Sequence, residues 1–199
     1  MWGCLSRVDT RDAELLSRMR AAGCWQISFG IESGDLEVLK RLKKNIAPEK
    51  AAEAVRAARK AGLRCHGFFM IGSPGETRES IRKTALLSRN IPLNTIQVSH
   101  FTPFPGSALY EELSGAGTLE AHFDRMNMWT PVYAPEGLTE DGLRRAATGM
   151  MLRFYFRPRI IFEFVMMGFS ASGVRKLALL AKLFAKGAAA LLFSGGRKN

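Results

Sequence analysis

Three short apolar runs in the sequence each end in a polar or glycine-rich turn, and these turns carry the residues that could bind a ligand. The candidates are Glu32, Ser33, Gly34, Gly72, Ser73, Pro74, Gly75, Thr102 and Pro103. A carboxylate accepts hydrogen bonds from hydroxyl or ammonium groups, and glycine lets the backbone turn close to a ligand. An apolar run that stops at such a turn before a helix start is typical of a buried parallel strand. Ligands of α/β folds lie at the carboxyl ends of these strands.

The segments between the turns have the patterns of alternating strands and helices. We expect strands at about residues 25–31, 64–71 and 95–101, and helices at 12–22, 48–61 and 76–89. Gly23 and Gly62 mark the ends of the first two helices, and Pro48 suits a first helical position. Further helices are expected at 139–155, 160–169 and 174–193. This alternation predicts an α/β fold with a parallel sheet and right-handed crossovers.

The motifs at the strand ends resemble, in type and order, those of the radical S-adenosylmethionine (SAM) superfamily. They are Gly23-Cys24-x-x-Ile27-x-x-Gly30-Ile31-Glu32-Ser33-Gly34, Gly72-Ser73-Pro74-Gly75-Glu76-Thr77 and Thr102-Pro103-Phe104-Pro105-Gly106-Ser107. The resemblance is closest to the cobalamin-binding branch of methyltransferases and cyclases. It covers residues 2–113 well and the remainder loosely, and it implies a TIM-type (β/α) barrel that binds SAM.

The resemblance implies a SAM contact for each of the nine candidate residues. Glu32 and Ser33 would meet the ammonium or ribose groups of SAM, with Gly34 allowing the turn. The turn from Gly72 to Gly75 would shape the pocket around the adenine and methionine parts, and the backbone after the next strand, at Thr102 and Pro103, would face adenine. A structural alternative stays open, because Glu-Ser-Gly-Asp also suits a helix N-cap and Glu76 suits a helix start.

Four ring side chains near the strands have two interpretations each. Phe101 or Phe104 could stack on a flat ligand ring, although aromatic residues at strand ends more often pack against neighbours. His66 and His100 could act in acid–base chemistry, although a lone strand histidine is more often only hydrogen-bonded. The catalytic residues are therefore not assigned from the sequence.

The cysteines do not form the cluster motif of the superfamily. CxxxCxxC is absent, and Cys4, Cys24 and Cys65 lack the spacing of a metal-binding loop, so we expect structural thiols and assign no metal ligand. Trp2-Gly3-Cys4-x-x-Arg7-Val8-Asp9 resembles the third strand of the family. The resemblance thus implies a partial barrel of about strand units 3–6, with the [4Fe-4S] cluster and any cobalamin held by sequence upstream of Met1 or by a separate cluster-bearing subunit.

These observations predict a partial barrel at residues 1–113 and a mainly helical extension at residues 114–199. The implied function is the SAM-binding, C-terminal part of a radical SAM enzyme that performs hydrogen abstraction or methyl transfer in the full-length protein. The alternative is a non-catalytic, degenerate remnant that binds a partner or a membrane. A SAM-dependent transferase without a cluster is disfavoured, because no glycine-rich methyltransferase loop is present.

The net charge of +11 is concentrated at the end of the chain. From Arg153 onward there are nine lysines and arginines against one acid, Glu163. The expected helix at 174–193 is basic and amphipathic, and it either caps the barrel or lies on an anionic membrane surface. We expect a small-molecule or lipid-like substrate and no nucleic acid, because aromatic and basic residues do not cluster. Without a recognisable signal peptide, a cytoplasmic protein is expected, with peripheral contact to the inner membrane surface as a variant.

Overall fold

The computed structural model describes residues 1–10, 12–44, 46–115 and 123–168. The chain divides into two compact units, Met1–Ala147 and Thr148–Asn199. The division expected from the family resemblance, after residue 113, stays a prediction. The helix expected at 174–193 lies outside the described residues.

The first unit contains a sheet of four parallel strands in the order β1-β2-β3-β4. The strands are β1 (Trp2–Ser6), β2 (Cys24–Glu32), β3 (Arg64–Ile71) and β4 (Thr95–His100). Each strand pairs with the next strand along the chain, as expected when helical crossovers connect parallel neighbours. The α/β fold and the three strands predicted by position are confirmed.

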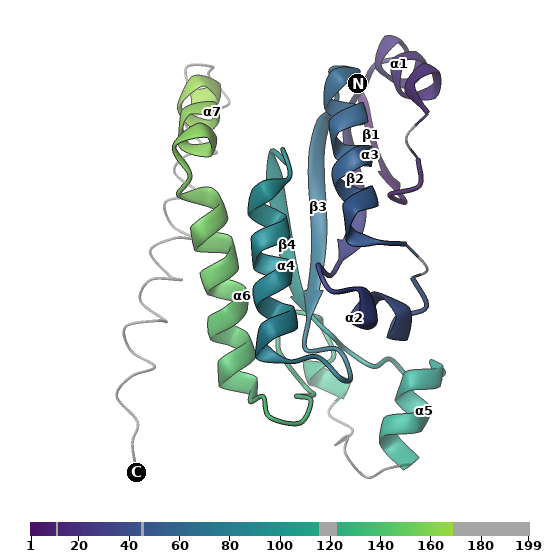
Figure 1. Cartoon of the computed structure of the whole chain (residues 1–199), viewed down its shortest axis with the longest axis vertical. Helices are drawn as coiled ribbons and strands as arrows, with labels where there is room; N and C mark the ends of the chain where they lie inside the picture. The colour runs from purple at the N-terminus through teal and green to yellow at the C-terminus, as the bar shows by residue number, and fades with distance from the viewer. Residues whose placement is uncertain (11, 45, 116–122, 169–199) are drawn as a thin grey trace. The chain divides into compact units, whose positions relative to one another are not determined.

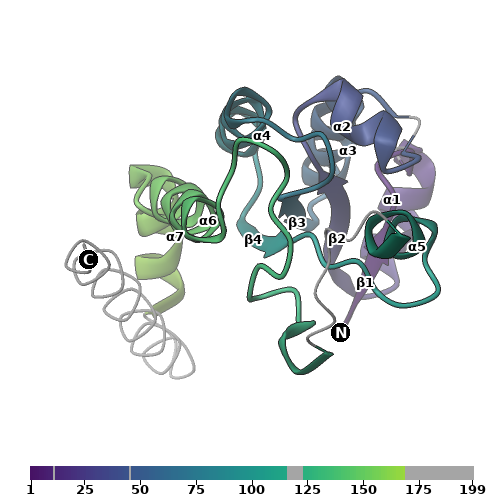
Figure 2. The same ribbon diagram turned by 90° about the horizontal axis from the view of Figure 1, so that it is seen from below.

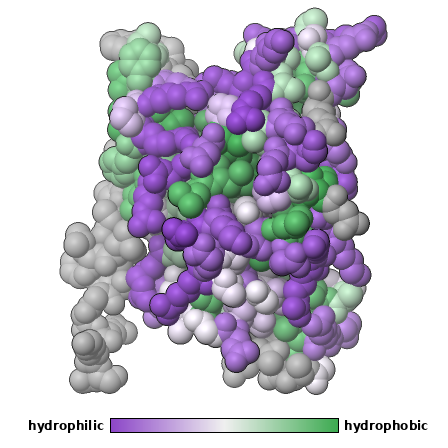
Figure 3. All heavy atoms as spheres, viewed as in Figure 1, coloured by the Kyte–Doolittle hydropathy of each residue, from purple (hydrophilic) through white to green (hydrophobic). Residues whose placement is uncertain are grey.

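Helices α3 and α4 cover one face of the sheet, as the two views of the ribbon show (Figures 1 and 2). The crossover helices are α1 (Ala13–Ala21), α3 (Pro48–Lys60) and α4 (Arg78–Asn90). In α3 the buried residues Ala51, Ala54, Val55 and Ala58 recur at helical spacing, so one stripe of the helix packs on the strands. The outward surface of these helices is mostly hydrophilic (Figure 3).

Alternation along β3 separates the two faces of the sheet. Cys65, Phe69 and Ile71 are fully buried, and the Cys65 thiol lies 3.8 Å from the Val55 carbonyl oxygen of α3. The residues that alternate with them, Arg64, His66, Phe68 and Met70, are half-buried. Successive side chains of a strand point to opposite faces, so these residues belong to the face opposite α3. A period-2 pattern therefore supplies both the packed core and a second, more accessible face.

Several remaining helices differ from the sequence expectations. The short helix α2 (Leu36–Arg41) was anticipated only by the alternative in which Glu-Ser-Gly-Asp caps a helix, and the helix α5 (Ala108–Gly115) was not predicted. Helices α6 (Glu140–Tyr155) and α7 (Pro158–Gly168) lie close to predicted positions. A 3₁₀ turn occupies Phe123–Arg125. Among the described residues, every helix is too short or too polar to span a membrane.

Candidate functional site at the strand ends

The three predicted turns lie at the same edge of the sheet. Glu32 is the last residue of β2, Gly72 follows β3, and Thr102 follows β4 by two residues. Register places Ile71 beside His100, and the Phe101 amide donates to the Ile71 carbonyl oxygen at 2.8 Å. Because neighbouring parallel strands end at one edge, residues far apart in sequence converge there. The structure thus brings the candidate turns together.

Glu32 has an unusual backbone conformation for a residue with a side chain. Its φ is +64°, in the left-handed region that non-glycine residues rarely adopt, and the register with β3 shifts between Gly30 and Glu32. The carboxylate receives a hydrogen bond from the Lys44 ammonium at 2.8 Å. A Cβ on Gly30 would lie 2.9 Å from Glu32 Oε1, so the glycine leaves room for the folded-back carboxylate. Lys44, which lies in an irregular loop, was not identified from the sequence.

The rest of the turn after β2 is attached to helix α4. Ser33 is fully buried, and its hydroxyl lies 3.1 Å from Thr84 Oγ1 and accepts from the Asp35 amide at 3.1 Å. A Cβ on Gly34 would lie 2.6 Å from the Lys83 carbonyl oxygen. The hydroxyl contacts of Ser33 and the close approach of Gly34 to α4 therefore explain both residues as parts of the turn. A SAM contact by either residue stays a prediction.

Asp35, rather than Glu32 or Ser33, is the N-cap of helix α2. Its side chain accepts from the Glu37 and Val38 amides, which satisfies donors that the helix start leaves unpaired. The Lys83 ammonium, 2.8 Å away, holds the pKa of the Asp35 carboxyl below its usual value. The N-cap interpretation of this segment is thus confirmed for its last residue.

A buried carboxyl group organises the turn after β3. Glu76 is 1% exposed, and its Oε2 accepts from the Gly72 and Ser73 amides. Helix α4 begins only at Arg78, with Thr77 as its N-cap, so the interpretation of Glu76 as a helix-start residue is wrong. Burial raises the pKa of Glu76 to about 7, against the opposing effect of the two amide donors.

Backbone conformation and close neighbours both explain why this turn has glycine at two positions. Gly72 and Gly75 have φ values of +87° and +74°, which glycine adopts without strain. A Cβ on Gly72 would lie 3.0 Å from Leu143, and one on Gly75 would lie 3.1 Å from the Arg41 guanidinium. Ser73 is buried with its hydroxyl oxygen unpaired, and Pro74 borders a hollow of about 530 Å³ beside Asp35.

An open cleft of about 610 Å³ lies between the end of α2 and the segment after β4. We call it the Arg41 cleft; the side chains used below are Arg41, Lys43, Met70, Phe104, Leu109 and Met128. Thr102 and Pro103 also line it and are buried. Phe104 is 45% exposed, whereas Phe101 is 6% exposed and packs edge-to-face on Tyr133. Phe104 is therefore the aromatic residue that remains accessible to a ligand.

The two strand histidines lie in different places. His66 pairs with Thr95, the first residue of β4, and its Nδ1 lies 2.8 Å from Thr95 Oγ1; it is at the far end of the strands from the turns. His100 is near the turns but 5% exposed, within electrostatic reach of Arg144. Burial lowers the pKa of both, so both imidazoles are neutral at pH 7. Acid–base chemistry by either stays a prediction.

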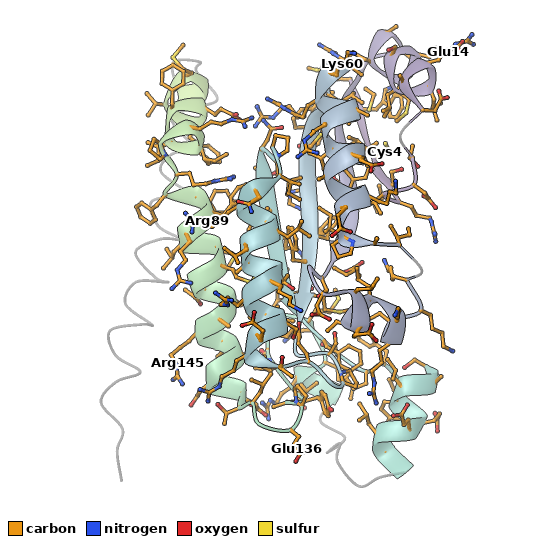
Figure 4. All side chains as sticks on the ribbon, viewed as in Figure 1. Cys4, Glu14, Lys60, Arg89, Glu136 and Arg145 are labelled. Carbon is orange, nitrogen blue, oxygen red and sulfur yellow. The ribbon has the colours of Figure 1, made fainter. Side chains whose placement is uncertain are left out.

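The thiols do not fit an iron–sulfur cluster. Among the described residues, no three His, Cys, Asp or Glu side chains come together as a metal site. Cys4 pairs with Ile27 in the middle of β2, away from the strand-end turns (Figure 4). Burial and the neighbouring Cys24 raise the pKa of Cys4, and burial raises that of Cys65 to about 12. Cluster ligands must be thiolates, and these environments favour neutral thiols.

Comparison with known proteins gives the family of this region. Residues 4–87 match the Radical SAM superfamily. The chain is 29% identical to an uncharacterized methyltransferase of Pyrococcus horikoshii, covering 81% of the chain and 36% of the relative. It is also 29% identical to the anaerobic magnesium-protoporphyrin IX monomethyl ester cyclase of Cereibacter sphaeroides, covering 92% and 29%, respectively. The chain thus spans about a third of the length of these relatives.

The fold also matches a solved structure. The radical SAM methyltransferase TsrM from Kitasatospora setae, with cobalamin and a [4Fe-4S] cluster bound, superposes with a TM-score of 0.62 at 17% identity. The match covers 74% of this chain and 36% of that enzyme. This likeness confirms the fold as a partial TIM-type barrel, to which the four parallel strands contribute. The region of residues 4–87, which carries the turns after β2 and β3, therefore belongs to the radical SAM superfamily.

Proposed function

We propose that this chain supplies the SAM-binding strand ends of a radical SAM enzyme of the cobalamin-binding branch. SAM supplies such enzymes with a radical that abstracts hydrogen, or with a methyl group. The observation that carries the proposal is the pairing of Glu32, the last residue of β2, with Lys44. Membership of the superfamily and similarity to an uncharacterized methyltransferase support it.

The Glu32–Lys44 pair has the charges that the amino acid part of SAM requires. SAM carries an ammonium and a carboxylate on one carbon, and Glu32 and Lys44 present the complementary charges 2.8 Å apart. The side chains are 19% and 39% exposed, so a ligand can replace their mutual contact with two charge-assisted hydrogen bonds. The left-handed φ of Glu32 holds its carboxylate over Gly30, which orients it before a ligand arrives.

The adenosine part would lie across the ends of β3 and β4. The Gly72 turn carries no side chain at its first position, and Thr102 and Pro103 present backbone at the base of the Arg41 cleft. Phe104, nearly half exposed, offers a ring face for stacking on adenine. Glu76 acts here as a positioning residue, because its carboxyl holds the Gly72 and Ser73 amides.

The cluster and the corrin belong, in this proposal, to other sequence. The described thiols do not fit a cluster, and the two relatives are about three times as long as the matched portion of this chain. We infer that the iron ligands and the cobalamin site come from an additional segment or from a cluster-bearing subunit. The substrate would be a small molecule, as the name of the cyclase of Cereibacter sphaeroides indicates for that relative.

Saturation-transfer difference NMR with SAM tests the proposal at millimolar affinity. We expect signals from the adenine protons with the unaltered chain, and an approximately tenfold weaker affinity after Glu32→Gln combined with Lys44→Gln. Glu37→Gln combined with Lys40→Gln is the control, because it removes another 2.8 Å ion pair, on α2. Equal losses in the two double variants, or no adenine signal with the unaltered chain, would contradict the proposal.

A second candidate function, membrane binding, is favoured by the exposed side of α7. Ile161 and Val165, and likewise Phe162 and Met166, follow one another at helical spacing, and each is at least 44% exposed. Such an apolar stripe beside basic residues suits the surface of an anionic bilayer. Cosedimentation with phosphatidylglycerol vesicles, lost after Phe162→Glu and absent with phosphatidylcholine alone, is the expected result for this function. Contact through 174–193 stays a prediction.

A further inference from the structure

The SAM proposal uses Thr102, Pro103 and Phe104 of the Arg41 cleft and leaves its other lining residues without a role. Its walls include Met70 from β3, Leu109 from α5 and Met128, whereas Arg41 and Lys43 stand at its rim at the end of α2. Glu112 is the carboxylate among the described lining residues, and it lies 3.5 Å from the Arg41 guanidinium. An apolar hollow with two cations against one acid favours a ligand that is both apolar and anionic.

Arg41 lies near Gly75, Glu112 and Tyr133. Its guanidinium passes over Gly75, where a Cβ would lie only 3.1 Å from Nη1. The Tyr133 phenol lies within electrostatic reach of Arg41 and Glu112, and its ring packs on the buried Phe101. Arginine presents several donors in a planar arrangement that matches carboxylate and phosphate oxygens. The Arg41 side chain is 51% exposed and its contact with Glu112 is long, so the guanidinium keeps donors for a ligand.

Lys43 supplements Arg41 from an unusual backbone position. Its φ is +55°, a left-handed conformation two residues after α2 ends at Arg41. The Lys43 side chain lines the Arg41 cleft, whereas Lys40 of α2 pairs with Glu37 at 2.8 Å and does not line the cleft. The helix C-terminus would itself repel an anion, so the two side-chain cations must provide the attraction.

We propose that the Arg41 cleft binds the substrate, and that this substrate is an apolar molecule with a terminal oxyanion, carboxylate or phosphate ester, held by Arg41 and Lys43. Its apolar body lies against Met70, Leu109 and Met128. As a substrate site the cleft rests on the proposed function, because only then do SAM and the second ligand meet at the strand ends. As an anion site it can be measured independently of SAM.

Titrations with three eight-carbon probes test the site in the full chain. Octyl phosphate and octanoate carry the two oxyanions, and octan-1-ol carries no charge; chemical-shift changes in amide NMR spectra report binding below micelle-forming concentrations. We expect both anions to bind at least tenfold more tightly than octan-1-ol, with shifts at residues that line the Arg41 cleft. Equal affinity for octan-1-ol would overturn the proposal. The anion that binds more tightly identifies the preferred oxyanion.

Variants at the rim separate a specific site from a general effect of charge. Arg41→Gln and Lys43→Gln should each weaken binding of the preferred anion about tenfold and leave octan-1-ol binding unchanged. Lys40→Gln, which removes the same charge as Lys43→Gln without touching the cleft, should change neither. An equal effect of Lys40→Gln would overturn the proposal. If Arg41→Gln lowers the temperature of thermal unfolding, the binding measurement with Lys43→Gln still tests the proposal, because the Lys43 side chain lies at the surface.

SAM binding distinguishes this inference from the proposed function. Arg41→Gln should retain the saturation-transfer signals of SAM, which depend on Glu32 and Lys44. Loss of SAM binding in Arg41→Gln, together with competition between SAM and octyl phosphate, would assign the cleft to SAM and overturn the inference. If the unaltered chain binds octyl phosphate but not SAM, the proposed function fails and the anion site stands.

Discussion

The turns after β2 and β3 differ from the rim of the Arg41 cleft in what their side chains contact. Ser33 and Glu76 are buried and bond to the protein's own backbone or helix α4. Arg41, Lys43 and Phe104 are exposed at the rim. Ser33 and Glu76 belong to the motifs that the family resemblance selects, and so does Phe104, whereas Arg41 and Lys43 belong to no motif. The comparison shows that a motif can mark the residues that build a turn as readily as those that contact a ligand.

The physical reason for this division is the geometry of the turns. A turn that follows a strand end has to be fixed by other contacts, because the ladder of hydrogen bonds along the strand has ended. Thr84 and Lys83 of α4 hold the turn after β2, and the carboxyl of Glu76 holds the turn after β3. The contacts that fix these turns are therefore as specific as ligand contacts would be.

The largest effect is expected from a methyl group added inside the turn after β2. In Gly34→Ala the new Cβ would lie 2.6 Å from the Lys83 carbonyl oxygen, and backbone atoms on both sides cannot move aside. We expect a loss of about 3 kcal/mol in the free energy of unfolding, measured by urea denaturation. Gly149→Ala is the opposite control, because Gly149 lies within helix α6 and, apart from its chain neighbours and the nearby backbone of that helix, no atom of the protein would lie within 4 Å of the new Cβ. This variant should be slightly more stable.

Glu76 should make stability depend on pH in the direction opposite to most acids. Its pKa is about 7 in the folded protein against 4.5 when exposed, so the folded state binds the proton more tightly. Its contribution to the free energy of unfolding, up to about 3 kcal/mol, is complete below pH 4.5 and is lost as pH rises through 7. Urea denaturation at pH 5 and pH 8 should show this difference in the unaltered chain and a smaller one in Glu76→Gln. An unchanged difference in the variant would show that another group causes it.

Loss of the Ser33 hydroxyl should have an intermediate effect. Ser33→Ala leaves the Asp35 amide and Thr84 Oγ1 without one buried partner, which costs about 1–2 kcal/mol. Thermal denaturation measures the loss. If Ser33→Ala instead leaves stability unchanged and abolishes SAM signals, the hydroxyl contacts the ligand and the division between the two regions fails.

The smallest effect on stability is expected at the rim. Phe104→Ala removes a side chain that is 45% exposed, so the free energy of unfolding should change by less than about 1 kcal/mol. Binding should respond instead, with weaker adenine signals in saturation-transfer NMR if Phe104 stacks on SAM. A stability loss comparable to that of Ser33→Ala would place Phe104 among the structural residues and contradict the division between the buried turns and the exposed rim.

The sequence by itself determined the parallel α/β fold and the convergence of its turns. Period-2 apolar strands, amphipathic helices such as α3 and Gly/Pro turns are local signals, and parallel neighbours must end at one edge. Helix α2, which the sequence indicated only through a possible N-cap, has six residues, too few to show a helical repeat. It exists because Asp35 caps it and its apolar side is buried.

Only the tertiary structure decided which residues of the site are internal and which are accessible. Glu76 has the sequence position of a helix-start acid, yet it lies buried beneath the Gly72 turn, because its loop folds back before α4 begins. Lys44 meets Glu32 across 12 residues, and Arg41 reaches the Arg41 cleft from a helix with no motif of its own. Such pairings depend on how loops from different strands pack, and charge and polarity along the chain carry no record of that packing.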